Sequence, residues 1–205
     1  MTDTVPRASG LALLSAGLGL LLGAAALWVG LGDGAIAQWA FGTACLLQVP
    51  PALSLRGRVL DGLGNRGLER ERRTLRSVSY LLRFLALGTA MAAVSALLGE
   101  RSPRLNVLPL GLSLMATASL GGLWLVKRSL EALHPALAQD ASRSRTLFEL
   151  AALLLAGSLL GRWFPWADAS TALVMAVGLF VEGRTLGKGS TLAPPSCAGG
   201  CGSCG

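Results

Sequence analysis

Uncharged apolar runs of about twenty residues alternate with short polar loops along this chain. Three of these runs, at residues 11–31, 34–55 and 105–126, contain no charged residue at all. Each is long enough to cross a hydrocarbon core of about 30 Å as an α-helix. The alternation is typical of a polytopic membrane protein and predicts an all-α fold.

Three weaker runs complete the predicted bundle. Residues 78–98 contain one charge, Arg83, whose long side chain can reach toward the membrane surface. The last two runs are shorter, but the aromatic turn between them, Trp163-Phe164-Pro165-Trp166, is typical of a hairpin tip at the headgroup level. We therefore expect a six-helix transmembrane domain over residues 11–188, with spans at about 11–31, 34–55, 78–98, 105–126, 146–162 and 166–184.

Lysine and arginine are concentrated in every second loop. If the N-terminal residues 1–10 are cytoplasmic, the cytoplasmic side receives fourteen of the eighteen cations and the other side three, with Arg83 inside a span. Cytoplasmic loops of membrane proteins carry such an excess. The sequence therefore predicts an N-in, C-in protein of the plasma (bacterial inner) membrane, with residues 189–205 as a cytoplasmic tail.

Composition excludes several classes of function. Hydrophobic residues make up 52% of the chain and charged residues 14%, and the mean hydropathy of +0.58 leaves no room for a large soluble domain. The net charge of +7 fits basic loops facing anionic lipids, so we expect the lipid bilayer as a partner and no nucleic acid. The chain has one histidine and no recognisable catalytic or phosphate-binding motif, and we expect no enzyme activity.

The last two predicted spans carry a resemblance to a known family. Residues 136–145 read Ala-Leu-Ala-Gln-Asp-Ala-Ser-Arg-Ser-Arg, residues 161–168 read Gly-Arg-Trp-Phe-Pro-Trp-Ala-Asp, and the final span closes with Glu182-Gly-Arg184. This region is similar to helices five and six of the cation diffusion facilitators, which are proton-coupled exporters of zinc and related divalent metals. The resemblance implies six spans, N-in and C-in, and a role in cation efflux.

The intramembrane metal site of that family is not reproduced. The family holds its metal through acidic or histidine ligands four apart on helix two and a His-x3-Asp pair on helix five, a spacing that puts both ligands on one helix face. Residues 34–55 contain no Asp, Glu or His, and the helix-five pair falls on Ser142 and Thr146 or on Arg143 and Leu147. We also expect no counterpart of the family's cytoplasmic C-terminal domain after the last span. We therefore expect an altered intramembrane site.

The predicted tail contains three of the four cysteines, Cys197, Cys201 and Cys204, in a Gly-rich stretch. In a reducing compartment such a cluster is typical of metal ligands or a redox element and not of a disulfide framework. Thiolates favour Cu(I) and Zn²⁺, and three of them are one short of a closed tetrahedral zinc site. These cysteines are therefore candidate metal ligands, and two alternatives stay open: a low-complexity end whose cysteines have no task, and lipidation.

Ionisable residues in or near a membrane are expensive to bury and are further candidates: Arg83, Asp140, Glu149 and Glu182. We expect Arg83 to pair with Glu149 or Glu182, and a proton or cation relay is the alternative. Within the second span, Gln38 is a candidate cavity residue and Cys45 is expected to pack as a small apolar residue.

Two classes of function follow from these patterns. The first is an integral membrane protein of metal-ion handling, resembling a zinc-type efflux transporter with an altered intramembrane site and binding a metal cation on its tail. The alternative is a non-transporting membrane scaffold or regulatory subunit that kept the transporter fold. In either case we expect a homodimer or a membrane partner. A third hypothesis is transport of another substrate through a cavity lined by Gln38, Thr43 and Gln48.

Overall fold

The computed structural model describes residues 4–54, 65–99, 107–130 and 135–191, and the regular structure within these ranges is helical. Its helices are α1 (Thr4–Asp33), α2 (Ile36–Leu47), α4 (Asn65–Leu98), α5 (Val107–Leu130), α6 (Pro135–Leu160) and α7 (Ala167–Thr191). Residues 49–54 are helical as well. The predicted all-α class is confirmed.

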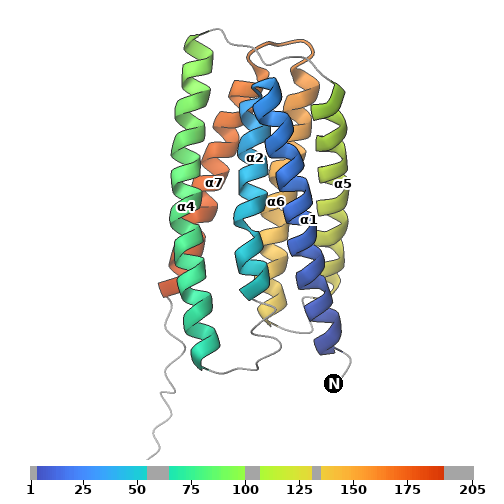
Figure 1. The fold of residues 1–205 in the computed structure, drawn as a ribbon, viewed down its shortest axis with the longest axis vertical. Coiled ribbons are helices and arrows are strands. Elements are labelled where there is room, and N and C mark those ends of the chain that lie inside the picture. The colour runs from blue at the N-terminus through green and yellow to red at the C-terminus, as the bar shows by residue number, and fades with distance from the viewer. Residues whose placement is uncertain (1–3, 55–64, 100–106, 131–134, 192–205) are drawn as a thin grey trace, which may run out of the picture.

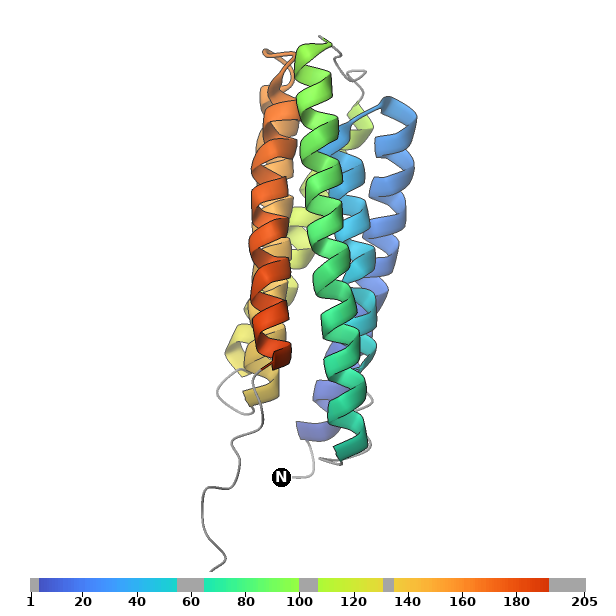
Figure 2. The ribbon, with the colours of Figure 1, turned by 90° about the vertical axis from the view of Figure 1, so that its left-hand side faces the viewer.

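The helices form one elongated bundle and alternate in direction along the chain (Figure 1). The start of α1 and the end of α7 therefore lie at the same end of the bundle, which we name the terminal end. The turn between α6 and α7 lies at the opposite, distal end. α1 packs mainly on α2, α5 on α6 and α4 on α7, and the last pair lies side by side in Figure 2. α2 also contacts α4, α6 and α7, so it joins the three pairs.

Among the described residues, four helical segments are long and apolar enough to cross a membrane: Gly10–Asp33, Arg72–Leu98, Val107–Ser129 and Ala167–Lys188. Their outward faces carry large apolar side chains, such as Trp28 and Leu98 at 83% exposure and Met91 at 74%. Soluble monomers rarely expose an apolar patch larger than a few hundred Å². The long apolar helices and their apolar outer surface therefore indicate a membrane protein.

Two segments that the sequence leaves between spans are partly helical. α4 begins at Asn65, well before the apolar run at 78–98, because residues 68–76 are rich in Leu, Glu and Arg, which are strong helix formers. α6 begins at Pro135, and proline suits the first helical position, where its missing N–H has no partner to lose. The apolar runs thus form only part of these two helices.

α2 ends at Leu47, inside the second predicted span. Pro50 and Pro51 follow it, and proline has no N–H to donate to the carbonyl four residues earlier, so the regular α-helical ladder is interrupted. The N–H of Gln48 donates instead to the carbonyl of Cys45 at 3.2 Å. The continuous part of α2 is therefore only about 18 Å long.

Glycines allow paired helices to approach closely. A Cβ atom on Gly42 of α2 would lie 2.7 Å from the carbonyl oxygen of Gly23 of α1, closer than real Cβ contacts. A Cβ atom on Gly183 of α7 would lie 3.0 Å from the carbonyl oxygen of Ser79 of α4. The Ser79 hydroxyl also donates a hydrogen bond to the Gly183 carbonyl at 2.6 Å. Such small-residue contacts are typical of helix packing in membranes.

Candidate functional site

A buried ion pair links α5 to α6 at the terminal end of the bundle. Lys127 lies in the last turn of α5, and its side chain is 1% exposed. Its Nζ lies 2.6 Å from Oδ2 of Asp140 and donates a hydrogen bond to Oγ of Ser144 at 2.8 Å. Asp140 and Ser144 are four residues apart in α6, so both face Lys127. Together they compensate an ammonium group whose burial would otherwise be strongly unfavourable.

A small cavity adjoins this ion pair. It has a volume of about 30 Å³, and its polar lining includes Lys127, Asp140 and Ser144 together with Arg143 and Gln48. A buried water needs at least about 10–15 Å³ of such space, so this cavity has room for only one or two waters. It is a water-sized polar pocket.

Arg143 and Glu182 extend the polar region toward α7. Arg143 is buried, and its positive charge acts on both Lys127 and Glu182. The Glu182 carboxylate accepts a hydrogen bond from Oγ1 of Thr146 at 3.2 Å. Two cations and two carboxylates are thus gathered from three helices, and their formal charges balance. We name this group the terminal cluster, and define it as Lys127, Asp140, Arg143, Ser144 and Glu182.

Arg83 lies outside the terminal cluster, between α4 and α7. Its Nη2 donates to the carbonyl oxygen of Gly183 at 3.4 Å. Glu149 forms its ion pair with Arg145 instead, with 2.7 Å between Oε1 and Nε, on the exposed face of α6. Among the described ranges, therefore, the expected pairing of Arg83 with Glu149 or Glu182 is not formed. A backbone carbonyl serves as acceptor for this arginine, as is usual for charged residues inside helical membrane domains.

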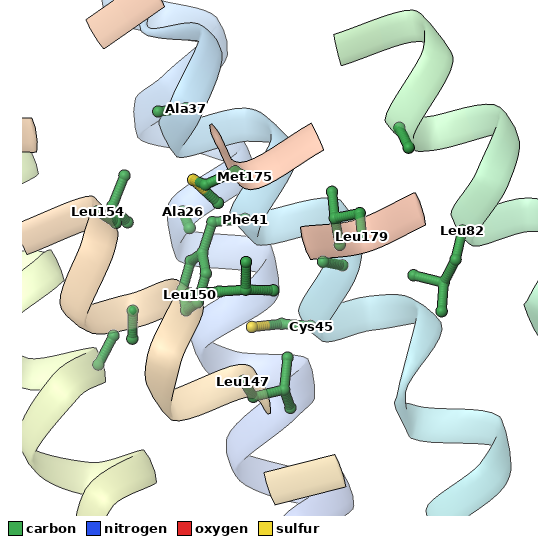
Figure 3. Packing of buried hydrophobic residues seen from close by; sticks show 14 of the residues in the cluster. Ala26, Ala37, Phe41, Cys45, Leu82, Leu147, Leu150, Leu154, Met175 and Leu179 are labelled. Carbon is green, nitrogen blue, oxygen red and sulfur yellow. The ribbon is translucent and has the colours of Figure 1, made fainter. Parts of the chain in front are cut away.

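The centre of the bundle, where α2 meets α6 and α7, is apolar (Figure 3). Phe41 and Cys45 of α2 are both 0% exposed, and Cys45 is a free thiol. Their neighbours in the same buried cluster, from α6 and α7, are Leu147, Leu150, Leu154, Met175 and Leu179. The candidate Cys45 thus lies in a hydrocarbon environment, in agreement with the packing role expected from the sequence.

Two registers of α6 could correspond to the His-x3-Asp metal ligands of the cation diffusion facilitators, and these two registers differ in burial. Ser142 is exposed and Thr146 is half-buried, whereas Arg143 and Leu147 are buried. The buried register is therefore Arg143 and Leu147. A guanidinium and a hydrocarbon side chain do not ligate a metal. Within the part of the chain that the structure describes, no group of three or more His, Cys, Asp or Glu residues could hold a metal ion.

Gln38, Thr43 and Gln48 of the second predicted span have different surroundings. Gln38 is 1% exposed near the distal end of α2, and its amide has no hydrogen-bond partner among the described residues. The Thr43 hydroxyl donates to the carbonyl of Trp39 at 2.9 Å, so its polar group is satisfied within its own helix. Gln48 lines the small terminal-end cavity, to which the other two do not contribute.

Asp168 connects the distal ends of α7 and α2. It lies in the first turn of α7, and its carboxylate accepts hydrogen bonds from the N–H groups of Ile36 at 2.8 Å and Ala37 at 3.3 Å. These N–H groups belong to the first turn of α2, which favours a negative charge. Asp168 thus caps a helix that is remote in the sequence.

Sequence reasoning missed Lys127 and Ser144. The charge pattern indicates that Lys127 is a loop cation, but the structure places it within α5 with its side chain turned into the bundle. The spacing of Asp140 and Ser144 on one face of α6, close after Lys127, is the signal that points to this pair. The predicted thiolate ligands lie outside the described residues: Cys197, Cys201 and Cys204.

No protein-family model matches this chain, and no curated protein matches it either.

Proposed function

We propose that this protein is a polytopic membrane protein of metal-ion handling that keeps the helical frame of a cation diffusion facilitator but carries no metal through its centre. In this proposal it acts as a non-transporting scaffold or regulatory subunit. Its metal contact is the cysteine tail on the cytoplasmic side.

The apolar packing between α2 and α6 carries this proposal. A transported divalent cation needs oxygen, nitrogen or sulfur ligands to replace its water. The interface offers Phe41, Leu147 and Leu150 instead, and its sulfur, on Cys45, is fully buried among them. The polar cavity beside Lys127 and Asp140 has room for only one or two waters. A cation passing between these helices would lose its hydration without compensation.

The proposed topology has six spans with both termini in the cytoplasm. In support, the start of α1 and the end of α7 share one end of the bundle, and the arginine-rich start of α4 and the basic last turn of α5 lie at that end as well. In this topology α2 completes its crossing with residues 49–54, and α6 crosses with its charged first half at the terminal end. Alkaline phosphatase and green fluorescent protein fused after residues 102, 164 and 190 test it. We expect phosphatase activity at the first two sites and fluorescence at the third; the reverse pattern contradicts the topology.

The role of the tail is tested by the metal content of the purified protein. Three cysteines within a short Gly-rich stretch provide the soft ligands that Zn²⁺ and Cu(I) favour. We expect full-length protein equilibrated with Zn²⁺ or Cu(I) to retain metal after desalting. A Cys197→Ser/Cys201→Ser/Cys204→Ser variant should lose that metal, while Cys45→Ser, the matched control, should keep it. Equal metal in all three proteins would contradict the proposed role.

A further inference from the structure

An open groove lies on the outer face of the α5–α6 hairpin, away from the buried terminal cluster. It has a volume of about 550 Å³, within the range of small-molecule sites. The residues that give it its chemistry are Trp124, Arg128, Ser142, Arg145, Phe148 and Glu149. None of them takes part in the metal-handling function proposed above.

The floor of the groove is aromatic. The rings of Trp124 and Phe148 stack with their centroids 5.7 Å apart and an interplanar angle of 11°. This contact joins α5 to α6 and presents an apolar surface. The guanidinium of Arg128 lies 5.6 Å from the centroid of the Trp124 ring, in range of a cation–π interaction.

The rim of the groove is basic. Arg128 and Arg145 are both exposed, and the single carboxylate of the lining, Glu149, is held by Arg145 at 2.7 Å. The lining therefore has a net charge of +1 and two guanidinium groups, which bind phosphate oxygens well because their donors form a planar fork. An anion is the ligand that matches this rim.

The groove also lies at a specific depth. The candidate span Val107–Ser129 ends one residue after Arg128, so the proposed topology puts this guanidinium near the boundary of the hydrocarbon core. Trp124 lies about one turn deeper on the same helix. A phospholipid has the same order of groups, with its phosphate at the boundary and its acyl chains beneath it. Free phosphate would use the two arginines but gain nothing from the rings.

We propose that this groove binds an anionic phospholipid, with the headgroup phosphate at Arg128 and Arg145 and an acyl chain against Trp124 and Phe148. The inference rests on the proposed membrane topology, but not on the proposed metal role. Basic pockets between transmembrane helices are known to select anionic headgroups, and each surface cation adds to the attraction.

Native mass spectrometry of the full-length protein in detergent, titrated with phosphatidylglycerol or phosphatidylcholine, tests the proposal. We expect phosphatidylglycerol to bind more tightly, and Arg128→Gln/Arg145→Gln to weaken its binding roughly tenfold or more. Arg184→Gln, which removes an exposed cation of α7, is the matched control and should leave binding unchanged. Arg128→Lys/Arg145→Lys keeps both charges without the planar fork and should bind more tightly than the glutamine variant, which separates charge recognition from misfolding.

Three results would overturn this inference. Equal binding of the two lipids would show that the headgroup charge is not recognised. Unchanged phosphatidylglycerol binding by the double glutamine variant would place the lipid elsewhere. Displacement of the lipid by millimolar inorganic phosphate would make the groove a free-phosphate site. Reporter fusions that contradict the topology would instead refute the membrane placement, and loss of tail metal would leave the lipid titration unaffected.

Discussion

The helix α6 contributes to two regions of opposite character, the apolar centre and the terminal cluster. In the centre, Leu150 and Leu154 belong to the same buried apolar cluster as Phe41, and Leu150 lies beside the Phe41 ring in Figure 3. Near its start, the same helix presents Asp140 and Ser144 to a buried lysine. The two regions are separated by only a few turns of one helix.

The difference shows where this bundle can tolerate charge. At the terminal end each buried charge has an opposite charge or a hydrogen-bond partner, which removes most of the penalty of burial. In the centre, packing between hydrocarbon side chains takes the place of polar contacts. A route for a cation between α2 and α6 would require polar groups in both regions, and the buried cluster around Phe41 is apolar.

Removing one partner of the buried ion pair should have the largest effect. Asp140→Ala leaves the Lys127 ammonium buried without its carboxylate, and should lower the free energy of unfolding by roughly 3–5 kcal/mol. Glu149→Ala, which breaks the exposed pair with Arg145, should cost less than about 1 kcal/mol. Unfolding in detergent followed by tryptophan fluorescence compares the two. Equal losses of unfolding free energy in the two variants would show that the Lys127–Asp140 pair is no more desolvated than the exposed Arg145–Glu149 pair.

The apolar centre should be the next most sensitive region. Leu154→Ala removes a side chain that is 2% exposed and leaves a void in the contact of α6 with α2 and α7, at a cost of roughly 2–5 kcal/mol. Leu125→Ala, at a position that is 58% exposed, should change stability by about 0.5 kcal/mol or less. The same unfolding assay applies. A large loss of stability in Leu125→Ala and none in Leu154→Ala would contradict the assignment of Leu154 to the buried core and of Leu125 to the outer surface.

The close approach of α1 and α2 predicts a smaller loss. Gly42→Ala places a Cβ atom against the backbone of α1, and the forced separation should cost roughly 1–3 kcal/mol. Gly88→Ala meets no atom within 4 Å, so the higher helix propensity of alanine should make it neutral or slightly stabilising. Thermal unfolding midpoints distinguish the pair. A destabilised Gly88→Ala with a normal Gly42→Ala would contradict the packing of these helices.

The cap between α7 and α2 should have the smallest effect. Asp168→Ala removes the acceptor for two N–H groups at the start of α2, and should cost roughly 0.5–2 kcal/mol. Asp168→Asn keeps an oxygen acceptor and should lose less. Hydrogen exchange at Ile36 and Ala37 gives the local readout. Unchanged protection of both amides in the alanine variant would exclude the cap.

The sequence predicts the all-helical class and the positions of the apolar segments, because these depend on local runs that each helix carries by itself. The first residues of α4 and α6 could not be predicted from hydropathy, because both helices include polar residues that the hydropathy pattern assigns to loops. The early end of α2 has a visible local cause in Pro50 and Pro51.

The candidate site was predicted only in part. Asp140 is a member of the terminal cluster, as is Glu182, but Lys127 resembles any cytoplasmic loop cation in a pattern that records charge and not side-chain direction. The cap formed by Asp168 could not be predicted, because its partners Ile36 and Ala37 are brought to it only by the packing of α2 against α7.

Zinc flux through reconstituted vesicles is the most direct test of the absence of a metal route through the apolar centre. Purified full-length protein is placed in vesicles that contain a fluorescent zinc indicator, and a proton gradient is imposed in each direction. The account predicts that zinc enters no faster than in protein-free vesicles, with or without the three tail cysteines. A saturable, protein-dependent zinc influx driven by the gradient would contradict it.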